Sequence, residues 1–289
     1  MTSSTRFVKQ VIDPQYVIEG AGVLLRRSFG PDRSNLFDPF LLFDHFAFND
    51  PLEGPIQGFP THPHRGIETV TYMLDGNTRH RDSLGNLGVI GPGDVQWMTS
   101  GRGIMHEEMP QRGPSGLVTG FQLWVNLPAA EKMSRPRYQE VTADTIPTVE
   151  QDGVKVSVVA GEYGGVKGPV TEIAAQPLYM DVTLEPGQLF SIPVPAGHTA
   201  VAYLFEGAGY FGGDGADQGE FVETVSLAVF DDGEQVQVQG GADSAARFML
   251  MAGAPFKEPI VPYGPFVMNT REEIMQALAD LRNGTFVEN

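Results

Sequence analysis

The sequence predicts an all-β protein that consists of two β-barrels and a short C-terminal helix. Its 289 residues include 35 Gly and 22 Pro, together about a fifth of the chain, and this composition favours many short strands joined by turns. Strand-like runs bounded by Gly, Pro or Asp recur along the whole chain. A weak internal repeat indicates that these strands form two related units.

The predicted strands have the length and spacing that sandwiches and barrels share. A first run, Phe7–Val11, lies near the start of the chain. The others follow in chain order: Val23–Phe29, Phe40–Phe46, Glu68–Leu74, Thr119–Leu127, Val154–Ala160, Leu178–Leu184, Thr199–Phe205, Val225–Phe230 and Ala246–Ala252. Their regular separation by turn residues favours a closed all-β architecture over a helical bundle.

One helix is expected, from Arg271 to Arg282. Thr270 and Glu273 form the pattern of a capping box, in which each side chain satisfies a backbone N–H at the start of the helix. Gly284 provides the stop, because glycine readily takes the left-handed conformation that ends a helix.

Two short matches carry the internal repeat. Thr71–Gly76 resembles Ala202–Gly207 at an offset of 131 residues, and Gly93–Gln96 resembles Gly233–Val236 at an offset of 140. Neither match would count alone, because strand-turn-strand sequences converge easily. Occurring in the same order, they favour a duplicated β-barrel.

The stretch Pro128–Glu150 is the best candidate for a connection between the two barrels. It is polar, mixed in charge and punctuated by proline. We therefore expect an N-terminal barrel over residues 1–135 and a C-terminal barrel over residues 136–289. A length of about 100–200 residues per domain agrees with this division.

Composition and charge exclude several classes of function. The absence of Cys excludes disulfides, thiolate zinc sites, iron–sulfur clusters and a cysteine nucleophile. The net charge of −17 argues against direct binding to nucleic acid or to an anionic membrane surface, since both need cationic patches. No run approaches the roughly 20 apolar residues of a membrane span, and no apolar run follows a basic start. The cytoplasm is therefore the expected compartment.

The histidines indicate a metal site. His62 and His64 are spaced i, i+2, and His106 and Glu108 have the same spacing, so in strands each pair points to one face. Three imidazoles and a carboxylate suit Fe, Mn, Ni, Cu or Zn. A metal centre is favoured over a group of ordinary core or surface histidines. Pro63 places the first pair at a strand start or edge, where a pocket mouth would lie.

These motifs resemble the pirin family of cupin proteins. The matching segments are Asp38–Asp44, His62–Gly66, Pro92–His106, Gln122–Leu127 and Gly264–Thr270. The resemblance covers nearly the whole chain. It implies a bicupin, with one divalent transition metal in the N-terminal barrel. The implied metal is Fe(II) first, with Mn, Ni, Cu and Zn as alternatives.

The resemblance places the metal ligands on His62, His64, His106 and Glu108. The general cupin pattern instead takes its carboxylate from the position of Glu68, which lies at i+4 from His64. On strand parity alone, Glu68 therefore stays an alternative to Glu108.

The second barrel is predicted to lack a metal. The two repeat offsets place Pro193 and Pro195 at the positions of the first two ligands, and Ala246 and Phe248 at the other two. None of these side chains binds a metal. His198 stands alone and is expected to be structural.

The resemblance also implies a reaction. Members of the family are associated with oxidative cleavage of flavonols such as quercetin, in which O2 opens the ring and carbon monoxide is lost. In that reaction Glu108 would serve as a ligand at rest and as a general base toward the substrate hydroxyl. The expected partners are thus a small aromatic, flavonol-like substrate and O2. The alternative is an iron-containing regulatory protein whose metal redox state controls its binding to a protein partner.

An aromatic substrate requires an apolar pocket. The candidates for its wall are the large side chains near the motifs, Phe46, Phe59, Met73, Trp97, Met98 and Phe121. The preceding segment, Asn49–Pro60, is expected to form either a rim or lid over the pocket or a plain connecting loop.

Overall fold

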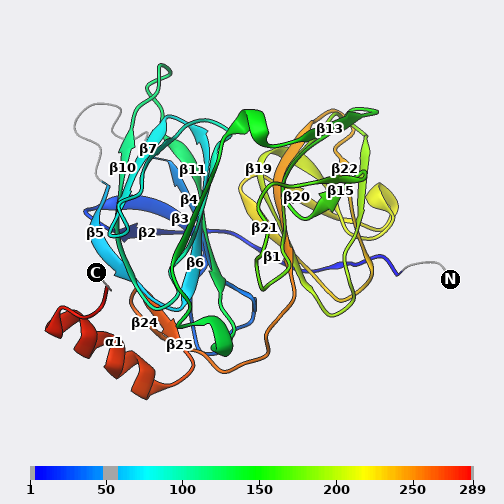
Figure 1. The fold of residues 1–289 in the computed structure, drawn as a ribbon. Coiled ribbons are helices and arrows are strands. Elements are labelled where there is room, and N and C mark those ends of the chain that lie inside the picture. Colours follow the sequence, from blue (N-terminus) through cyan, green and yellow to red (C-terminus); the bar gives the residue numbers. More distant parts are fainter. Residues whose placement is uncertain (1–3, 48–57, 288–289) are drawn as a thin grey trace. The chain divides into compact units, whose positions relative to one another are not determined.

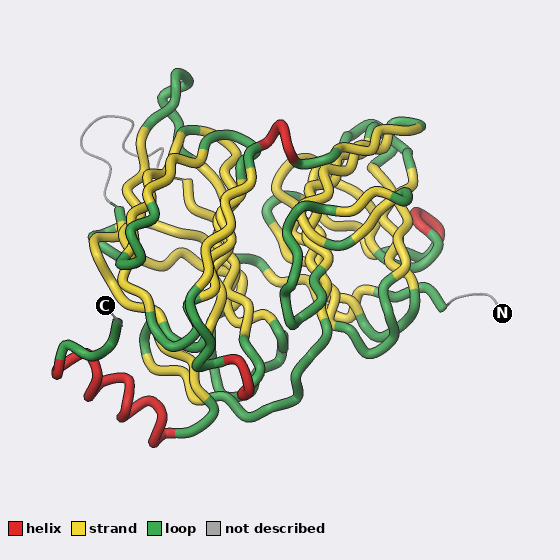
Figure 2. The backbone as a smooth tube through the Cα atoms, viewed as in Figure 1, coloured by secondary structure: helices red, strands yellow, loops and turns green. Residues whose placement is uncertain are grey.

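The computed structural model describes residues 4–47 and 58–287, and these residues form mainly antiparallel strands (Figure 1). Figure 2 shows the same dominance of strands, and α1 (Arg271–Asn283) is the one α-helix within the described ranges. The predicted all-β class with a C-terminal helix is therefore confirmed. No helix in this part of the chain is long and apolar enough to span a membrane.

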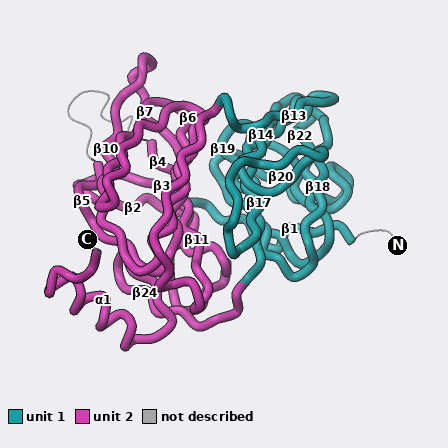
Figure 3. The backbone as a smooth tube through the Cα atoms, viewed as in Figure 1, with its two compact units in different colours: residues 1–14, 144–255 teal, residues 15–143, 256–289 magenta. Residues whose placement is uncertain are grey.

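The chain forms two compact units that are not continuous in sequence (Figure 3). Unit 1 takes its residues from 1–14 and 144–255, and unit 2 from 15–143 and 256–289. The division differs from the predicted domains 1–135 and 136–289 at both ends of the chain. The reason is strand pairing: Val8–Ile12 pairs with a strand of unit 1, and Phe266 forms a bridge with Arg65 of unit 2.

Unit 2 contains two sheets that hold the candidate site. The seven-stranded sheet has the order β12 (Arg137–Val141), β9 (Val95–Thr99), β6 (Ile67–Asp75), β11 (Thr119–Asn126), β4 (Phe40–Ala47), β3 (Val23–Phe29) and β2 (Gln15–Glu19). The four-stranded sheet has the order β5 (Phe59–His64), β10 (Ile104–Gln111), β7 (Asn77–Asp82) and β8 (Leu87–Ile90).

Unit 1 is built mainly on one ten-stranded sheet. Its main path is β1 (Val8–Ile12), β21 (Ser226–Phe230), β19 (Thr199–Phe211), β23 (Ala246–Gly253), β17 (Leu178–Leu184), β14 (Val154–Ala160) and β13 (Thr148–Gln151). The strands outside this path are β18 (Leu189–Pro193), β20 (Glu220–Glu223) and β22 (Gln235–Gly240). A small separate hairpin joins β15 (Glu162–Tyr163) and β16 (Val166–Lys167).

The main sheets of the two units repeat one strand order. The path from β12 to β2 in unit 2 corresponds strand by strand to the path from β1 to β13 in unit 1, with β6 matching β19. The match of Thr71–Gly76 with Ala202–Gly207 lies on these two strands, so the offset of 131 is confirmed. The offset of 140 is wrong, because Gly93–Gln96 leads into β9 whereas Gly233–Val236 leads into β22, which is not the counterpart of β9.

Strand register then gives the counterparts of the ligand positions. His80 on β7 lies opposite Glu108. Under the offset of 131, the counterpart of His80 is Phe211 on β19, and Phe211 lies opposite Val238. The counterparts of His62, His106 and Glu108 are therefore Ile192, Val236 and Val238, in place of the predicted Pro193, Ala246 and Phe248. All three are buried apolar residues.

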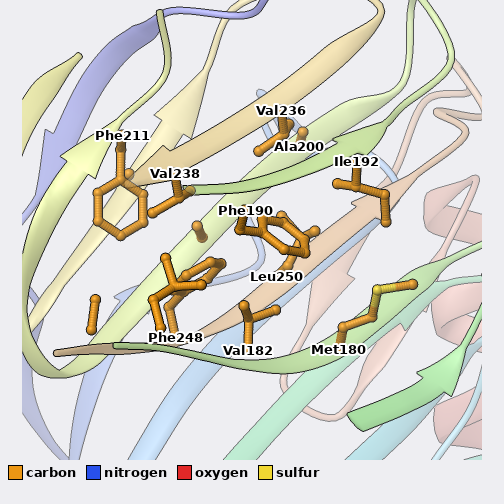
Figure 4. Packing of buried hydrophobic residues seen from close by; sticks show 14 of the residues in the cluster. Met180, Val182, Phe190, Ile192, Ala200, Phe211, Val236, Val238, Phe248 and Leu250 are labelled. Atoms are coloured by element: carbon orange, nitrogen blue, oxygen red, sulfur yellow. The ribbon is translucent and has the colours of Figure 1, made fainter. Parts of the chain in front are cut away.

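The interior of unit 1 is filled by apolar side chains. Figure 4 shows Phe190, Phe211 and Phe248 among the aliphatic residues of this cluster. The ring of Phe248 makes edge contacts with the rings of the other two, with centroids 5.8 and 5.4 Å apart. The three histidines of the predicted metal site, by contrast, all belong to unit 2. The candidate site therefore lies in unit 2.

The C-terminal segment of unit 2 packs beside the histidine strand. It comprises β24 (Val261–Tyr263), β25 (Phe266–Met268) and α1, whose first turn has the predicted capping box of Thr270 and Glu273. Gly284 ends the helix with a φ of 71°. The side chain of Arg65 pairs with Asp280 of α1 at 2.7 Å and donates to the carbonyl of Arg102. These contacts hold the turn that directly follows His64.

Candidate metal centre

Strands β5 and β10 lie side by side (Figure 1), and three histidines converge where they pair. His62 lies directly opposite His106 in the antiparallel register, and His64 follows on the same face of β5. One ring nitrogen from each residue lies within 4.8 Å of the others. The cross-strand register thus brings together side chains that are about 40 residues apart in sequence.

Hydrogen bonds to the backbone determine which ring nitrogens of the first pair carry protons. Nδ1 of His62 is 2.9 Å from the carbonyl of Pro60, and Nδ1 of His64 is 3.2 Å from the carbonyl of Pro265. A carbonyl accepts only, so each Nδ1 donates, and each neutral ring presents a lone pair at Nε2. The two Nε2 atoms lie 3.1 Å apart. Two facing lone pairs repel each other unless a cation lies between them.

His106 supplies the third donor. It is buried, and neither of its ring nitrogens has a hydrogen-bond partner among the described residues. Burial and the neighbouring imidazoles hold the pKa of His106 well below its usual range and lower the pKa of His64 to about 3. Metal binding requires the neutral ring. The three imidazoles therefore fit a divalent transition ion.

His80 is a neighbour that the sequence analysis did not single out. Its ring centroid is 5.4 Å from that of His106, and its Nε2 lies 3.2 Å from the carboxylate of Asp82. On its other side it stacks on Tyr138 at 4.7 Å. The alternation of Thr78, His80 and Asp82 in a polar strand was the available signal, since these side chains share one buried face. The His80–Asp82 pair therefore packs beside His106 on its buried side.

Glu108 lies on the same face of β10 as His106 but outside the three-histidine group. Its Oε1 accepts a hydrogen bond from the Thr71 hydroxyl at 2.9 Å, and the same hydroxyl lies 2.9 Å from the side-chain oxygen of Gln122. Glu107 points to the other face, where the Thr61 hydroxyl donates to it. The role of Glu108 as fourth ligand stays a prediction.

Glu68 is directed away from the site. β5 ends at His64 and β6 begins at Ile67, with Gly66 at a φ of 80° between them, so strand parity does not carry across this turn. Glu68 lies three residues from Thr71, hence on the opposite face of β6, and it accepts a hydrogen bond from Thr99 at 2.7 Å. Burial raises the pKa of Glu68 to about 7.

The raised pKa of Glu68 predicts a pH-dependent stability. The folded state binds the proton of Glu68 more tightly than the unfolded chain does. The stabilisation that this proton provides is therefore complete below pH 4.5 and is lost as the pH rises through about 7. Over this window the free energy of unfolding of the wild type should fall by up to about 3 kcal/mol relative to that of Glu68→Gln. Urea unfolding of both proteins at pH 5 and pH 8 measures the difference. Parallel pH profiles would contradict the prediction.

A cavity of about 580 Å³ adjoins the histidines. Its wall includes His62, His64 and Glu108, and two of the predicted apolar residues, Phe46 and Phe59. Met73, Trp97, Met98 and Phe121 are buried but do not line it, because they pack within the sheets. Of the predicted rim or lid Asn49–Pro60, Phe59 and Pro60 line the cavity, and residues 49–57 lie outside the described residues.

Comparison with known proteins identifies the family. Residues 22–125 match the pirin family and residues 179–287 match the pirin C-terminal cupin domain. Pirin from Homo sapiens is 47% identical over 268 residues, which cover 92% of this chain and 88% of that protein. The chain belongs to the pirin family. A pirin-like protein from Caulobacter vibrioides is 45% identical, over 97% of this chain and 99% of the relative.

A solved structure from this family bears an enzyme name. The crystal structure of a quercetin 2,3-dioxygenase from Acinetobacter baumannii matches with a TM-score of 0.87 and 35% identity, over 98% of this chain and 99% of that one. The predicted bicupin pirin fold is thereby confirmed. The family thus contains proteins named pirin and proteins named quercetin 2,3-dioxygenase.

Proposed function

We propose that this protein is a metal-dependent dioxygenase that cleaves flavonols such as quercetin. The observation that carries the proposal is the convergence of three imidazole nitrogens, two of them 3.1 Å apart, beside a cavity with a largely apolar wall. An apolar cavity with a few polar groups suits a flat aromatic ligand. The similarity to the Acinetobacter baumannii quercetin 2,3-dioxygenase supports the same reaction class.

His62, His64 and His106 would hold the ion, with Glu108 as the proposed fourth ligand. Fe(II) is our first choice, and Mn, Ni, Cu and Zn are the alternatives that such donors accept. When bound, the ion supplies a Lewis acid for a substrate hydroxyl and a redox centre for O2.

Glu108 is the proposed general base. Its Oε1 is held by the Thr71 hydroxyl, and this bond orients the carboxylate along the cavity wall. Oε2 can then take up the proton of a substrate hydroxyl, which increases the electron density of the ring that O2 attacks.

Oxygen uptake and carbon monoxide release test the proposal. Iron-loaded wild type should consume O2 with quercetin and release one CO per O2. His62→Ala should lose both metal and uptake, and Glu108→Ala should lower kcat by about a hundredfold or more, the scale of a general base. Glu107→Ala is the matched control, because this neighbouring carboxylate faces away from the cavity and should leave uptake unchanged. No metal-dependent uptake in the wild type would overturn the proposal. Full oxygen uptake by Glu108→Ala would show that Glu108 is not the general base.

A further inference from the structure

A row of polar side chains crosses the wall of the cavity. We call it the polar belt, and its members all line the cavity: Glu19, Arg27, Asp44, Gln122, Thr71 and Glu108. Its central members lie directly opposite one another on neighbouring strands, from β3 through β4 and β11 to β6. The belt therefore connects the carboxylate beside the histidines with a charged group three strands away.

Arg27 and its two carboxylates form the charged end of the belt. The Nε and Nη2 atoms of Arg27 each donate to Asp44 at 2.8 Å, and Nη1 donates to Glu19 at 2.8 Å. A guanidinium has five N–H groups, so two of them have no partner among the described residues. The side chain of Asp44 is 4% exposed and that of Glu19 is 44% exposed. The charged end thus runs from the inside of the cavity to its rim.

Stability does not account for this charged end. The cavity around it is lined by apolar residues such as Leu25, Leu42 and Phe46. Replacement of a buried ion pair by apolar side chains of similar volume is often neutral or stabilising, because both charges lose their hydration when buried.

Unit 1 provides an internal comparison. The register of the matching strands places Val158 opposite Met180, Met180 opposite Leu250, and Leu250 opposite Ala202. These residues stand where the belt has Arg27, Asp44, Gln122 and Thr71, and all four belong to the apolar core of unit 1. The same fold therefore forms with an entirely apolar row. The polar row in unit 2 is a property of its cavity.

We propose that the Arg27 end of the belt recognises hydroxyl groups at the end of the substrate opposite the one that faces the histidines. This inference rests on the proposed function and specifies its substrate class: planar aromatic molecules with hydroxyl groups at both ends. A phenolic hydroxyl can donate to Asp44 or Glu19 and accept from an N–H of Arg27. Three strand spacings, about 14 Å along the sheet, separate Arg27 from Thr71.

A comparison of two flavonols tests the inference. Galangin has the flavonol core of quercetin but lacks the two hydroxyls on the phenyl ring that is attached to the fused ring system. Binding is measured without oxygen, on iron-loaded protein, by quenching of tryptophan fluorescence, and Trp124 lines the cavity. The wild type should bind quercetin about tenfold or more tightly than galangin, the scale of a hydrogen bond to a charged group. In Arg27→Met/Asp44→Leu the two affinities should differ by less than about twofold.

A second ion pair in the same chain provides a matched control. Arg247 binds both carboxylate oxygens of Asp181, at 3.1 and 2.8 Å, and also contacts Glu206, but it does not line the cavity. Arg247→Met/Asp181→Leu should keep the wild-type preference for quercetin. Equal binding of the two flavonols by the wild type would overturn the inference, as would a preference that persists in Arg27→Met/Asp44→Leu.

The outcome separates this inference from the proposed function. Selective binding without oxygen uptake would support the polar belt and overturn the dioxygenase. Oxygen uptake with the same quercetin preference in the wild type and in Arg27→Met/Asp44→Leu would support the dioxygenase and overturn the belt. If neither flavonol binds, both proposals fail.

Discussion

Replacement of His106 by alanine is expected to lower the affinity for a divalent transition ion by at least about a hundredfold. Loss of a residue that only supports a metal ligand lowers affinity by about 10–100-fold, and loss of a ligand should exceed this range. His106 is buried and has no hydrogen-bond partner among the described residues, so a metal is the partner that would satisfy its ring.

Competition with a chelator of known affinity measures this loss directly for Fe(II) or Ni(II). Thermal unfolding provides a second readout, because an ion that binds only the folded state raises Tm by an amount that increases with the logarithm of its affinity. The rise should be large in the wild type and in Glu107→Ala, and small in His106→Ala. An unchanged affinity in His106→Ala would contradict the assignment of the three histidines as a metal site.

Local spacing was sufficient to predict the strand-like runs that lie in the two main sheets and the shared face of His62 and His64. His62 and His64 share a face as alternate residues of one strand, and His106 joins them because β10 pairs with β5. The capping box of Thr270 and Glu273 is equally local, since both groups belong to one helical turn.

Long-range pairing explains what the sequence could not predict. The first 14 residues belong with unit 1 because Val8 lies opposite Phe230, more than 200 residues away. Strand parity placed Glu68 on the face of His64, but the turn at Gly66 interrupts the strand and directs Glu68 to the other face. The polar belt depends on the register of four strands, and no local pattern in the sequence reports that register.

The two barrels differ at the positions of the histidines and of the polar belt. In unit 1 the positions of the histidines and of the belt carry apolar side chains, and aromatic rings occupy the interior. In unit 2 the same positions are polar, and a cavity of about 580 Å³ lies between them. Polar residues placed there lose hydration without an equivalent gain in packing. A second large effect, on the free energy of unfolding, is therefore expected when the charges of the polar belt are left unbalanced.

Arg27→Met alone is expected to reduce the free energy of unfolding by about 3–5 kcal/mol at pH 8, because it leaves the buried Asp44 carboxylate without a counter-ion. Arg27→Met/Asp44→Leu should return to within about 1 kcal/mol of the wild type, since no buried charge then remains at this position. Urea unfolding of the three proteins measures both changes. Equal losses in the single and double variants would show that packing of the Arg27 side chain, rather than its charge, stabilises the wall.

The pH dependence of the single variant identifies the cause of its instability. Burial already raises the pKa of Asp44, and Arg27 is the group that opposes this shift. Without Arg27 the pKa rises further, so the folded state binds the proton more tightly than the unfolded chain does. Stability is then lost as the pH rises through the folded-state pKa, and the deficit of Arg27→Met should shrink at pH 5 relative to pH 8. Arg247→Met should also lower the free energy of unfolding, but by less than Arg27→Met does. Arg247 is 32% exposed and Arg27 is 21% exposed, so the ion pair of Arg247 is better hydrated.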